Sequence, residues 1–407
     1  MNITHSVSLL FVYPLFLVTI CHQSAIAYPA EYDSIVAQRV VDSLSLSQFK
    51  SYIKSLADFG GRYAGSSSNA QAREWIKETM ADLGYDNVET QSTRNNVYCT
   101  KVGAVSPDSM YIVSAHFDGM KVAESANDDG SGCGLVLEGA RIFANPLIKT
   151  HYSIRWALWN DEEIGLLGSK AYVAERKPYQ GTTEPVWLGI VQHDMILFDH
   201  GLPPQDQQIP DADIDVEYQQ NSTAAAQSLA LAQELVQGCK DYATDYPADI
   251  GNKMSNTDSD PFKNYIAAVS IRENCRLDEI GNGSDPHWHT ATDLYATFSE
   301  KDFLLGYNAM QMTIGTICRL AGVYDSTPTP VTDYEILNKA RPVVSPHVEA
   351  IVIFSVQGKK VAESRNVNNL ERYLLDIRRR GNLSHGVYIV NLITGHGTQL
   401  RFFKIWH

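Results

Sequence analysis

The sequence predicts an α/β protein with a mixed, largely parallel central sheet flanked by helices, followed by a small C-terminal β-sandwich. Apolar runs of strand length alternate with helical segments from about residue 50 to residue 323. Most of these runs are continuous rather than alternating, which is typical of strands buried on both faces of a parallel sheet. After residue 343, short strand-like runs follow one another without an amphipathic helix, which favours a separate β domain.

Length and charge restrict the classes of function. The 407 residues allow two or three domains, and a hydrophobic content of 44% suffices for a large core. Lys and Arg number 33 against 47 Asp and Glu, which gives a net charge of −14. Nucleic acids and anionic membranes bind basic surfaces, so we expect neither as a partner.

The first element is an apolar stretch from about Leu9 to Ile20, which Pro14 interrupts. It is too short and too broken to span a membrane. The small residues of Ala25-Ile26-Ala27 follow at the positions that a signal peptidase reads. We therefore predict a cleaved signal peptide, residues 1–27, and a protein that is secreted or held at the cell surface.

The second domain, predicted for residues 28–324, carries the alternating strands and helices. The expected buried strands are SMYIVSAHF (109–117), SIRWALW (153–159), VWLGIVQH (186–193) and YIAAVSI (265–271). The expected helices are NAQAREWIKETMADLG, ending at Gly84, STAAAQSLALAQELVQG, ending at Gly238, and SEKDFLLGYNAMQMTIGTICRLAG, opening with a capping box at Ser299 and Asp302.

A break in the pattern separates the last domain. DSTPTPVTD, residues 325–333, has the prolines and small polar residues of a linker, which we extend to residues 325–342. The β-sandwich is predicted for residues 343–407, from runs such as VEAIVIFSV and GVYIVNLIT.

Cysteine usage argues against a thiolate metal site. Five cysteines remain after residue 27, so at least one thiol is free, and no CxxC pair is present. Cys133 and Cys318 fall in helical patterns and are expected to be buried. Cys239 with Cys275 is the disulfide to test first, although spacing alone does not fix the pairing.

Residues able to bind a metal stand where the buried strands end. The first strand ends on His116, with Asp118 two residues further on, and Glu162 and Glu163 follow the second strand. Asp194 follows the third. The loop ANDDGSG supplies Asp128 and Asp129, and DPHWHTATD supplies His289. Ligands of open α/β sheets bind beyond the carboxyl ends of the strands, so these side chains are expected to share one crevice.

Two histidines and several carboxylates without a thiolate suit zinc in an open, catalytic site. Two metals need one shared carboxylate and two further ligands each. The available set is His116, Asp128, Glu163, Asp194 and His289. Glu162 is left over, and a spare carboxylate beside a metal-bound water is what general-base hydrolysis requires.

The strings SAHFDG, ANDDGSG, WNDEEIGLLGS, VQHDM and HTATD stand in this order within residues 50–323. Together they resemble the co-catalytic zinc aminopeptidases of the bacterial leucyl aminopeptidase type, which have the zinc exopeptidase fold. The resemblance implies two Zn²⁺ ions bridged by Asp128. One zinc would be completed by His116 and Asp194, and the other by Glu163 and His289.

The same resemblance assigns roles to the remaining residues. Glu162 would be the general base that activates a zinc-bound water, and Asp118 would orient the imidazole of His116. A cis peptide bond is implied between Asp128 and Asp129. The implied activity is a secreted metallo-aminopeptidase that hydrolyses the N-terminal residue from peptides with a free N-terminus.

Some neighbouring residues leave alternatives open. Asp129 is as acidic as Asp128 and is expected mainly to shape the loop. His287 is a rival to His289, which the string HTATD favours. His193 points to the opposite face of its strand from Asp194 and is expected in the core.

Other residues near these strings have alternative roles. Asp258 and Asp260 lie where relatives place a loop that faces the site. Met195, Ile271 and the aromatics near Tyr265 could line a pocket, with core packing as the default. Arg272 and Glu273 replace apolar residues found in some relatives, which leaves the side-chain specificity open.

The tail, roughly residues 343–407, is similar to the C-terminal sorting domains of the type IX secretion system, because IVIFSVQGKKV is followed by GVYIVNLITGHGTQLRFFKIW. The resemblance implies the type IX machinery as a partner. The alternative is an accessory β-sandwich for binding or stability.

Three rivals to the aminopeptidase interpretation remain. A glutaminyl cyclase shares the fold but is a single-zinc transferase, and the intact set of five ligands argues against it. A metal-free binding protein would have lost ligands, and none is missing here. A carboxypeptidase or dipeptidase of the same fold is harder to separate, because only pocket residues differ.

Overall fold

The computed structural model describes residues 28–199, 213–243, 245–254, 256–274 and 284–325, together with the backbone of four strands between residues 348 and 405. The chain divides into two compact units, Met1–Thr329 and Pro330–His407. The predicted signal peptide, residues 1–27, lies outside the described residues, and so does the predicted linker after Asp325.

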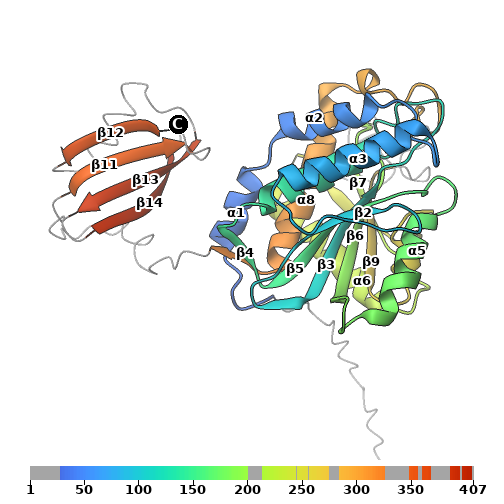
Figure 1. Ribbon diagram of the computed structural model, residues 1–407, viewed down its shortest axis with the longest axis horizontal. Helices are drawn as coiled ribbons and strands as arrows, with labels where there is room; N and C mark the ends of the chain where they lie inside the picture. Colours follow the sequence, from blue (N-terminus) through green and yellow to red (C-terminus); the bar gives the residue numbers. More distant parts are fainter. Residues whose placement is uncertain are drawn as a thin grey trace, which may run out of the picture. The chain divides into compact units, whose positions relative to one another are not determined.

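An eight-stranded sheet forms the centre of the first unit, in the order β1-β2-β5-β3-β6-β9-β7-β8 (Figure 1). Its strands are β1 (Glu89–Thr90), β2 (Val97–Lys101), β3 (Ser106–His116), β5 (Tyr152–Trp159), β6 (Val186–His193), β7 (Ile214–Glu217), β8 (Ala248–Gly251) and β9 (Ala267–Glu273). The four middle strands are parallel, whereas β2 and β7 run antiparallel to them. The predicted mixed, largely parallel sheet is confirmed.

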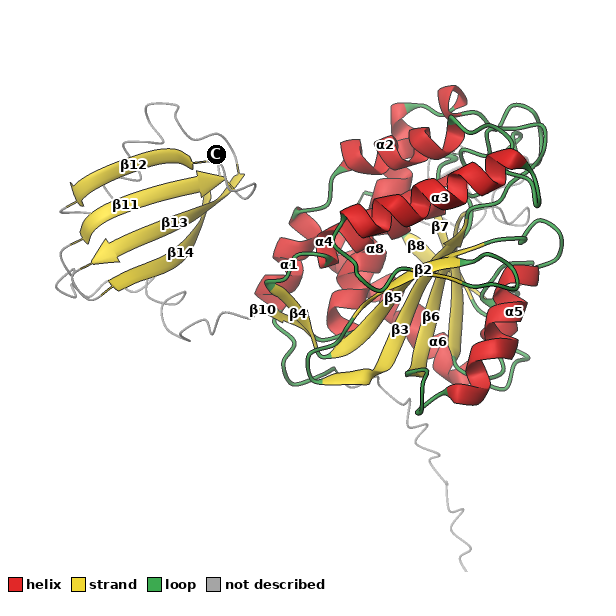
Figure 2. Ribbon diagram, in the orientation of Figure 1, coloured by secondary structure: helices red, strands yellow, loops and turns green. Residues whose placement is uncertain are grey.

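Helices cover both faces of this sheet (Figure 2). They are α1 (Ser34–Asp42), α2 (Leu46–Ala57), α3 (Ser67–Asp82), α4 (Gly130–Phe143), α5 (Leu167–Arg176), α6 (Ala225–Tyr242) and α8 (Glu300–Leu320), with short 3₁₀ helices at Lys177–Tyr179, Asp260–Phe262 (η3) and Tyr295–Thr297 (η4). The side chains of β3 point alternately into two hydrophobic cores. Val113 and Ala115 pack into the larger core, and Met110 and Ile112 into the smaller one beneath α5.

The sequence predicts the start of α8 correctly but not the end of α6. The capping box of α8 is confirmed, because the backbone N–H of Ser299 donates to Asp302 Oδ2 at 2.5 Å. The predicted end of α6 at Gly238 is wrong, since the helix continues to Tyr242. A Cβ at Gly238 would lie 2.0 Å from Thr316 Oγ1 on α8, so this glycine permits close helix packing rather than ending the helix.

Two smaller sheets complete the structure. β4 (Ile148–Thr150) pairs with β10 (Val323–Asp325) in the first unit. The described strands of the second unit are β11 (Val348–Ser355), β12 (Lys360–Val367), β13 (Gly386–Thr394) and β14 (Gly397–Ile405). They form one antiparallel sheet in the order β12-β11-β13-β14. The second sheet that a sandwich requires stays a prediction.

Two further observations concern the described residues alone. None of their helices has the length and apolar character needed to cross a lipid bilayer. Cys133 and Cys318 are buried free thiols, as expected. Cys239 is also a free thiol, whose Sγ donates to the carbonyls of Ala243 and Tyr246. Its suggested disulfide partner, Cys275, lies outside the described residues.

Candidate metal centre

The site forms where three adjacent parallel strands end. β5, β3 and β6 are neighbours, and His116 at the end of β3 is in register with Trp159 at the end of β5. Glu162 and Glu163 follow β5, and Asp194 follows β6. The carboxyl ends of these strands therefore bring the predicted residues to one edge of the sheet.

Asp128 lies between the two predicted histidine ligands. Its Oδ1 is 3.3 Å from Nε2 of His116, and its Oδ2 is 3.2 Å from Nε2 of His289. The Nε2 atom of His289 also lies 3.1 Å from Glu163 Oε2. Each oxygen of one carboxylate thus faces a different imidazole, which is the arrangement that a bridging ligand needs.

Among the described residues, two groups of three side chains place their ligand atoms within 4.8 Å of one another. One group is His116, Glu162 and Asp194, and the other is Asp128, Glu163 and His289. Glu162 therefore lies as close to the His116 end as a ligand would. The distance from His116 Nε2 to Asp194 Oδ1 is 3.8 Å.

Asp118 contacts both His116 and the turn that carries Glu162 and Glu163. Its Oδ1 and Oδ2 accept hydrogen bonds of 3.1 Å from the backbone N–H groups of Glu162 and Glu163. The Nδ1 atom of His116 lies 3.6 Å from Asp118 Oδ1 and 3.3 Å from its carbonyl oxygen. The carbonyl oxygen of Asp118 therefore lies within hydrogen-bond distance of the imidazole, and its buried carboxylate fixes the turn that carries the two glutamates.

Asp129 shapes the loop rather than entering either group. Its carboxylate accepts hydrogen bonds from the backbone N–H groups of His116 and of Gly132, where it caps α4. A Cβ at Gly132 would lie 2.5 Å from this carboxylate, so only glycine fits there. The peptide bond between Asp128 and Asp129 is cis, as the resemblance implies.

Backbone strain is concentrated in the loops of the site. Seven described non-glycine residues have a positive φ, and three of them are a site residue or its chain neighbour: Asp161 before Glu162, Met195 after Asp194, and His289 itself. Such conformations cost of order 1–3 kcal/mol each and persist where the surrounding structure enforces them. The fold therefore positions these ligand-bearing segments at a cost in backbone conformational energy.

The charges of the site call for a cation. Burial lowers the pKa of His116, but the surrounding carboxylates, led by Glu162, outweigh it and raise that pKa well above its ordinary value. Hydrogen bonds to Asp128 and Glu163 raise the pKa of His289 to about 10. Burial and the charge of Asp258 raise the pKa of Glu162. Carboxylates thus outnumber the cations available to balance them.

The residues fit zinc. All donors are imidazole nitrogens or carboxylate oxygens, the set that catalytic zinc sites use. Oε1 of Glu163 is buried and accepts no hydrogen bond within the described structure. A divalent cation would satisfy that oxygen and would restore ordinary acidity to the neighbouring carboxylates.

Several alternatives from the sequence lie outside both groups. His193 is buried against Ser114 and Thr313, as expected for a core histidine. The ring of His287 contacts Thr292. Asp260 pairs with Lys263, and Tyr265 packs against Lys177 at the surface. Asp258 differs, because its fully buried carboxylate accepts from Ser169 and its charge acts on Glu162.

Sequence reasoning missed the residues that hold the Asp128 loop in place. Asp293 accepts hydrogen bonds from the backbone N–H groups of Asn127 (2.8 Å) and Asp128 (3.1 Å). The Asn127 side chain in turn bonds to Glu273 and to the backbone of Leu197. Asp293 and Asn127 belong to the strings HTATD and ANDDGSG, but no spacing rule distinguishes a loop anchor from a surface residue.

A fully buried arginine was missed in the same way. Arg62 donates to the carbonyl oxygens of Phe117, Glu124 and Ser125, all in the segment between the first histidine and Asp128. It lies in RYAGSSSNAQAREWI, which also fits the family resemblance, although nothing in that string assigns a role to the arginine. In this loop, the guanidinium supplies the hydrogen-bond donors that a helix or strand would provide for these backbone carbonyl oxygens.

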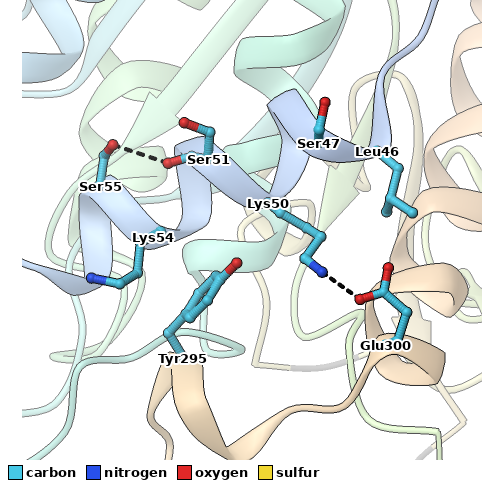
Figure 3. Close-up of a pocket in the computed structure, with 8 residues that line it drawn as sticks. All are labelled: Leu46, Ser47, Lys50, Ser51, Lys54, Ser55, Tyr295 and Glu300. Carbon is cyan, nitrogen blue, oxygen red and sulfur yellow. Dashed lines mark hydrogen bonds and ion pairs between the residues drawn. The ribbon is translucent and has the colours of Figure 1, made fainter.

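A separate groove of about 600 Å³ lies between α2 and the start of α8 (Figure 3). Lys50 and Lys54 line it together with Tyr295. The ammonium groups are paired with Glu300 and Asp58, respectively. The groove contains none of the predicted metal ligands.

The comparisons with known proteins agree with this geometry. The model of "Peptidase family M28" matches residues 96–310. Leucine aminopeptidase 1 of Ajellomyces capsulatus is 24% identical over 176 residues, which cover 38% of this chain and 45% of that relative. The chain thus spans less than half the length of the curated relatives it matches.

Solved structures share the fold at low identity. The LapA aminopeptidase of Legionella pneumophila superposes with a TM-score of 0.58 at 16% identity, over 73% of this chain and 77% of that one. The glutaminyl cyclase of Porphyromonas gingivalis gives a TM-score of 0.51 at 20% identity, over 68% and 98% of the two chains. Both likenesses concern the fold alone.

Proposed function

The chain belongs to peptidase family M28, and on that premise we propose that it is a zinc-dependent aminopeptidase of the leucyl aminopeptidase type, which hydrolyses the N-terminal residue from peptides. The observation that carries the proposal is the position of Asp128, whose two oxygens face the imidazoles of His116 and His289 at 3.3 and 3.2 Å. A bridging carboxylate between two nitrogen donors supports a pair of metal ions.

The proposed site holds two Zn²⁺ ions. His116 and Asp194 would hold one of them, Glu163 and His289 the other, and Asp128 both. Zinc bound there supplies a Lewis acid for the scissile carbonyl and makes water a better nucleophile at neutral pH. Asp118 keeps the His116 ring in place by contacting its Nδ1 side.

Glu162 handles the proton in this proposal. Its backbone is fixed by Asp118, and its carboxylate lies beside His116 and Asp194. From there it accepts a proton from the attacking water and delivers it to the leaving amine nitrogen. General acid–base catalysis of this kind contributes about 10²–10⁴-fold to the rate.

The substrate is a peptide with a free N-terminus. The α-ammonium group is a cation, and the carboxylates around the His116 end attract it. An acylated N-terminus lacks that charge and adds bulk, so it is expected to bind poorly. This distinguishes an aminopeptidase from a carboxypeptidase, which reads the other end of the chain.

Export is part of the proposal. The apolar stretch before Ala25-Ile26-Ala27 supports a signal peptide, and the resemblance of the tail to type IX sorting domains supports delivery to the cell surface or the medium. The net charge of −14 supports a partner other than nucleic acid.

The runner-up is a single-zinc transferase similar to glutaminyl cyclases, which the shared fold supports. The presence of a complete second group, Asp128 with Glu163 and His289, favours the two-metal hydrolase.

The test uses zinc-loaded protein with a leucyl peptide and its N-acetylated twin. We expect hydrolysis of the free peptide alone, abolished by a chelator and restored by zinc. Equal hydrolysis of both peptides would indicate a carboxypeptidase. Inertness towards both, with cyclisation of an N-terminal glutaminyl peptide, would support the transferase.

A further inference from the structure

The two ends of the candidate metal site differ in how open they are. The side chain of His116 is 1% exposed and that of Asp194 is 9% exposed, whereas that of His289 is 38% exposed. The part of a peptide beyond the scissile bond has to lead out to solvent, and the exposed end offers it that path. In an aminopeptidase of this geometry, the residue after the scissile bond therefore lies beside His289.

Two large apolar side chains are exposed at this open end. Trp288 precedes His289 and is 56% exposed, and Ile164 follows Glu163 and is 38% exposed. The loop before α8 and the turn after β5 meet at the two ligands, because His289 Nε2 lies 3.1 Å from Glu163 Oε2. A single exposed apolar residue is ordinary, but one from each of the two segments that meet at a ligand pair indicates a binding surface.

The indole of Trp288 is the larger part of that surface. Trp156, Trp159 and Trp187 are at most 3% exposed and pack into the two cores, so core packing explains them but not Trp288. The indole lies against the ring of His289, with the ring centroids 4.4 Å apart and the planes inclined by 32°. This contact holds a rigid aromatic surface beside a proposed metal ligand, with access from solvent.

We infer, on the basis of the proposed aminopeptidase activity, that Trp288 is a specificity-determining residue that selects peptides whose second residue is aromatic or large and aliphatic. The side chain of that second residue packs on the exposed indole, with Ile164 as a further apolar contact. Glycine has no side chain to pack there, and a polar side chain would lose hydration against the indole without gaining a partner.

The test varies the second residue of the substrate and keeps the first constant. Initial rates are measured for the amides of leucyl-phenylalanine, leucyl-serine and leucyl-glycine with zinc-loaded wild-type protein, Trp288→Ala and Trp288→Phe. Tyr179→Ala is the matched control, because Tyr179 is 55% exposed but precedes β6, whose other end leads to Asp194. Zinc content is measured for each variant.

We expect the wild type to favour the phenylalanine over the glycine substrate by about three- to tenfold in kcat/KM, mostly through KM. Trp288→Ala removes that preference, Trp288→Phe keeps part of it, and Tyr179→Ala leaves it unchanged. The preference of the wild type alone tests the inference if Trp288→Ala does not fold.

Three results would overturn the inference. A wild type without preference for the phenylalanine substrate would show that the second side chain does not meet Trp288. A preference that survives in Trp288→Ala would place that contact elsewhere. An equal loss on all three substrates in Trp288→Ala, with lowered zinc content, would show that Trp288 only supports the ring of His289. Failure of the proposed function looks different, because the wild type would then hydrolyse none of the three substrates.

Discussion

The two histidines of the candidate metal site occupy opposite environments. His116 ends the central strand β3, is 1% exposed, and its Nδ1 lies 3.3 Å from the carbonyl oxygen of Asp118. His289 stands in the loop between β9 and α8, has a positive φ of 58°, and is 38% exposed. The difference shows that one half of the site belongs to the scaffold, while the other half is supplied by a loop that bends towards it.

The paired glutamates give the sharpest test of this division, because they are neighbours with different proposed tasks. Glu162→Gln removes the proton acceptor at the His116 end, and we expect kcat to fall about 10²–10⁴-fold with zinc content unchanged. Glu163→Gln is the matched variant, and it should lose zinc from the His289 end. Kinetics and zinc analysis of both variants check this, and loss of zinc from Glu162→Gln instead would reverse the two roles.

The two histidines should also differ in their effect on stability. His116→Ala in zinc-free protein leaves buried carboxylates without their partner, so we expect a loss of about 3–5 kcal/mol in the free energy of unfolding. His289→Ala removes a solvent-screened side chain, and the loss should stay within about 1 kcal/mol. Urea unfolding measures both values, and equal losses would contradict the scaffold-and-loop description.

The buried His193 should make the free energy of unfolding depend on pH. Burial lowers its pKa to about 4 in the folded protein, below the value of about 6.5 for an unfolded chain. The unfolded chain therefore binds the proton first as the pH falls. The contribution of neutral His193 to the free energy of unfolding is complete above pH 6.5. It falls by about 3 kcal/mol as the pH is lowered to 4.

Replacing this histidine should flatten the pH dependence. In His193→Gln the free energy of unfolding of zinc-free protein should change less between pH 7 and pH 4.5 than in the wild type. Other titrating groups, His116 among them, are common to both proteins and cancel in the comparison. Identical slopes would show that His193 has the same pKa in the folded and unfolded states, which would contradict the lowered pKa.

Asp293 tests how the loop end is held. Its carboxylate accepts two backbone N–H groups next to the proposed bridging ligand. Asp293→Asn keeps the shape but offers one acceptor oxygen, and we expect zinc affinity to fall about 10–100-fold. Competition with a chromophoric chelator measures this, with Asp260→Asn as a control whose carboxylate pairs with Lys263. An affinity equal to that of the control would remove Asp293 from the site.

The sequence predicts the scaffold half well because burial leaves a pattern. The continuous apolar runs of β3, β5 and β6 are visible; β3 ends on His116, Glu162 follows shortly after β5, and Asp194 comes directly after β6. The strand-end rule then brings His116, Glu162 and Asp194 together without further information. The parallel sheet with flanking helices follows from the same runs.

The other features of the fold and the site cannot be predicted from local sequence, because contacts between distant segments determine them. Gly238 resembles a helix end in the sequence, yet it lies inside α6 because Thr316 of α8 packs against it. Arg62 and Asp293 support the site through backbone contacts with segments 55 or more residues away. The prediction of His289 rests on the family resemblance rather than on a pattern, since no periodicity fixes the conformation of a loop.

Native mass spectrometry of zinc-loaded protein gives the sharpest test of the bridged two-metal site, because it counts metal ions per chain. We expect two zinc ions in the wild type, one in His289→Ala with the His116 end still filled, and none held stably in Asp128→Ala. A wild type that binds a single zinc ion, with His289→Ala unchanged from it, would contradict the bridged two-metal site and favour the transferase.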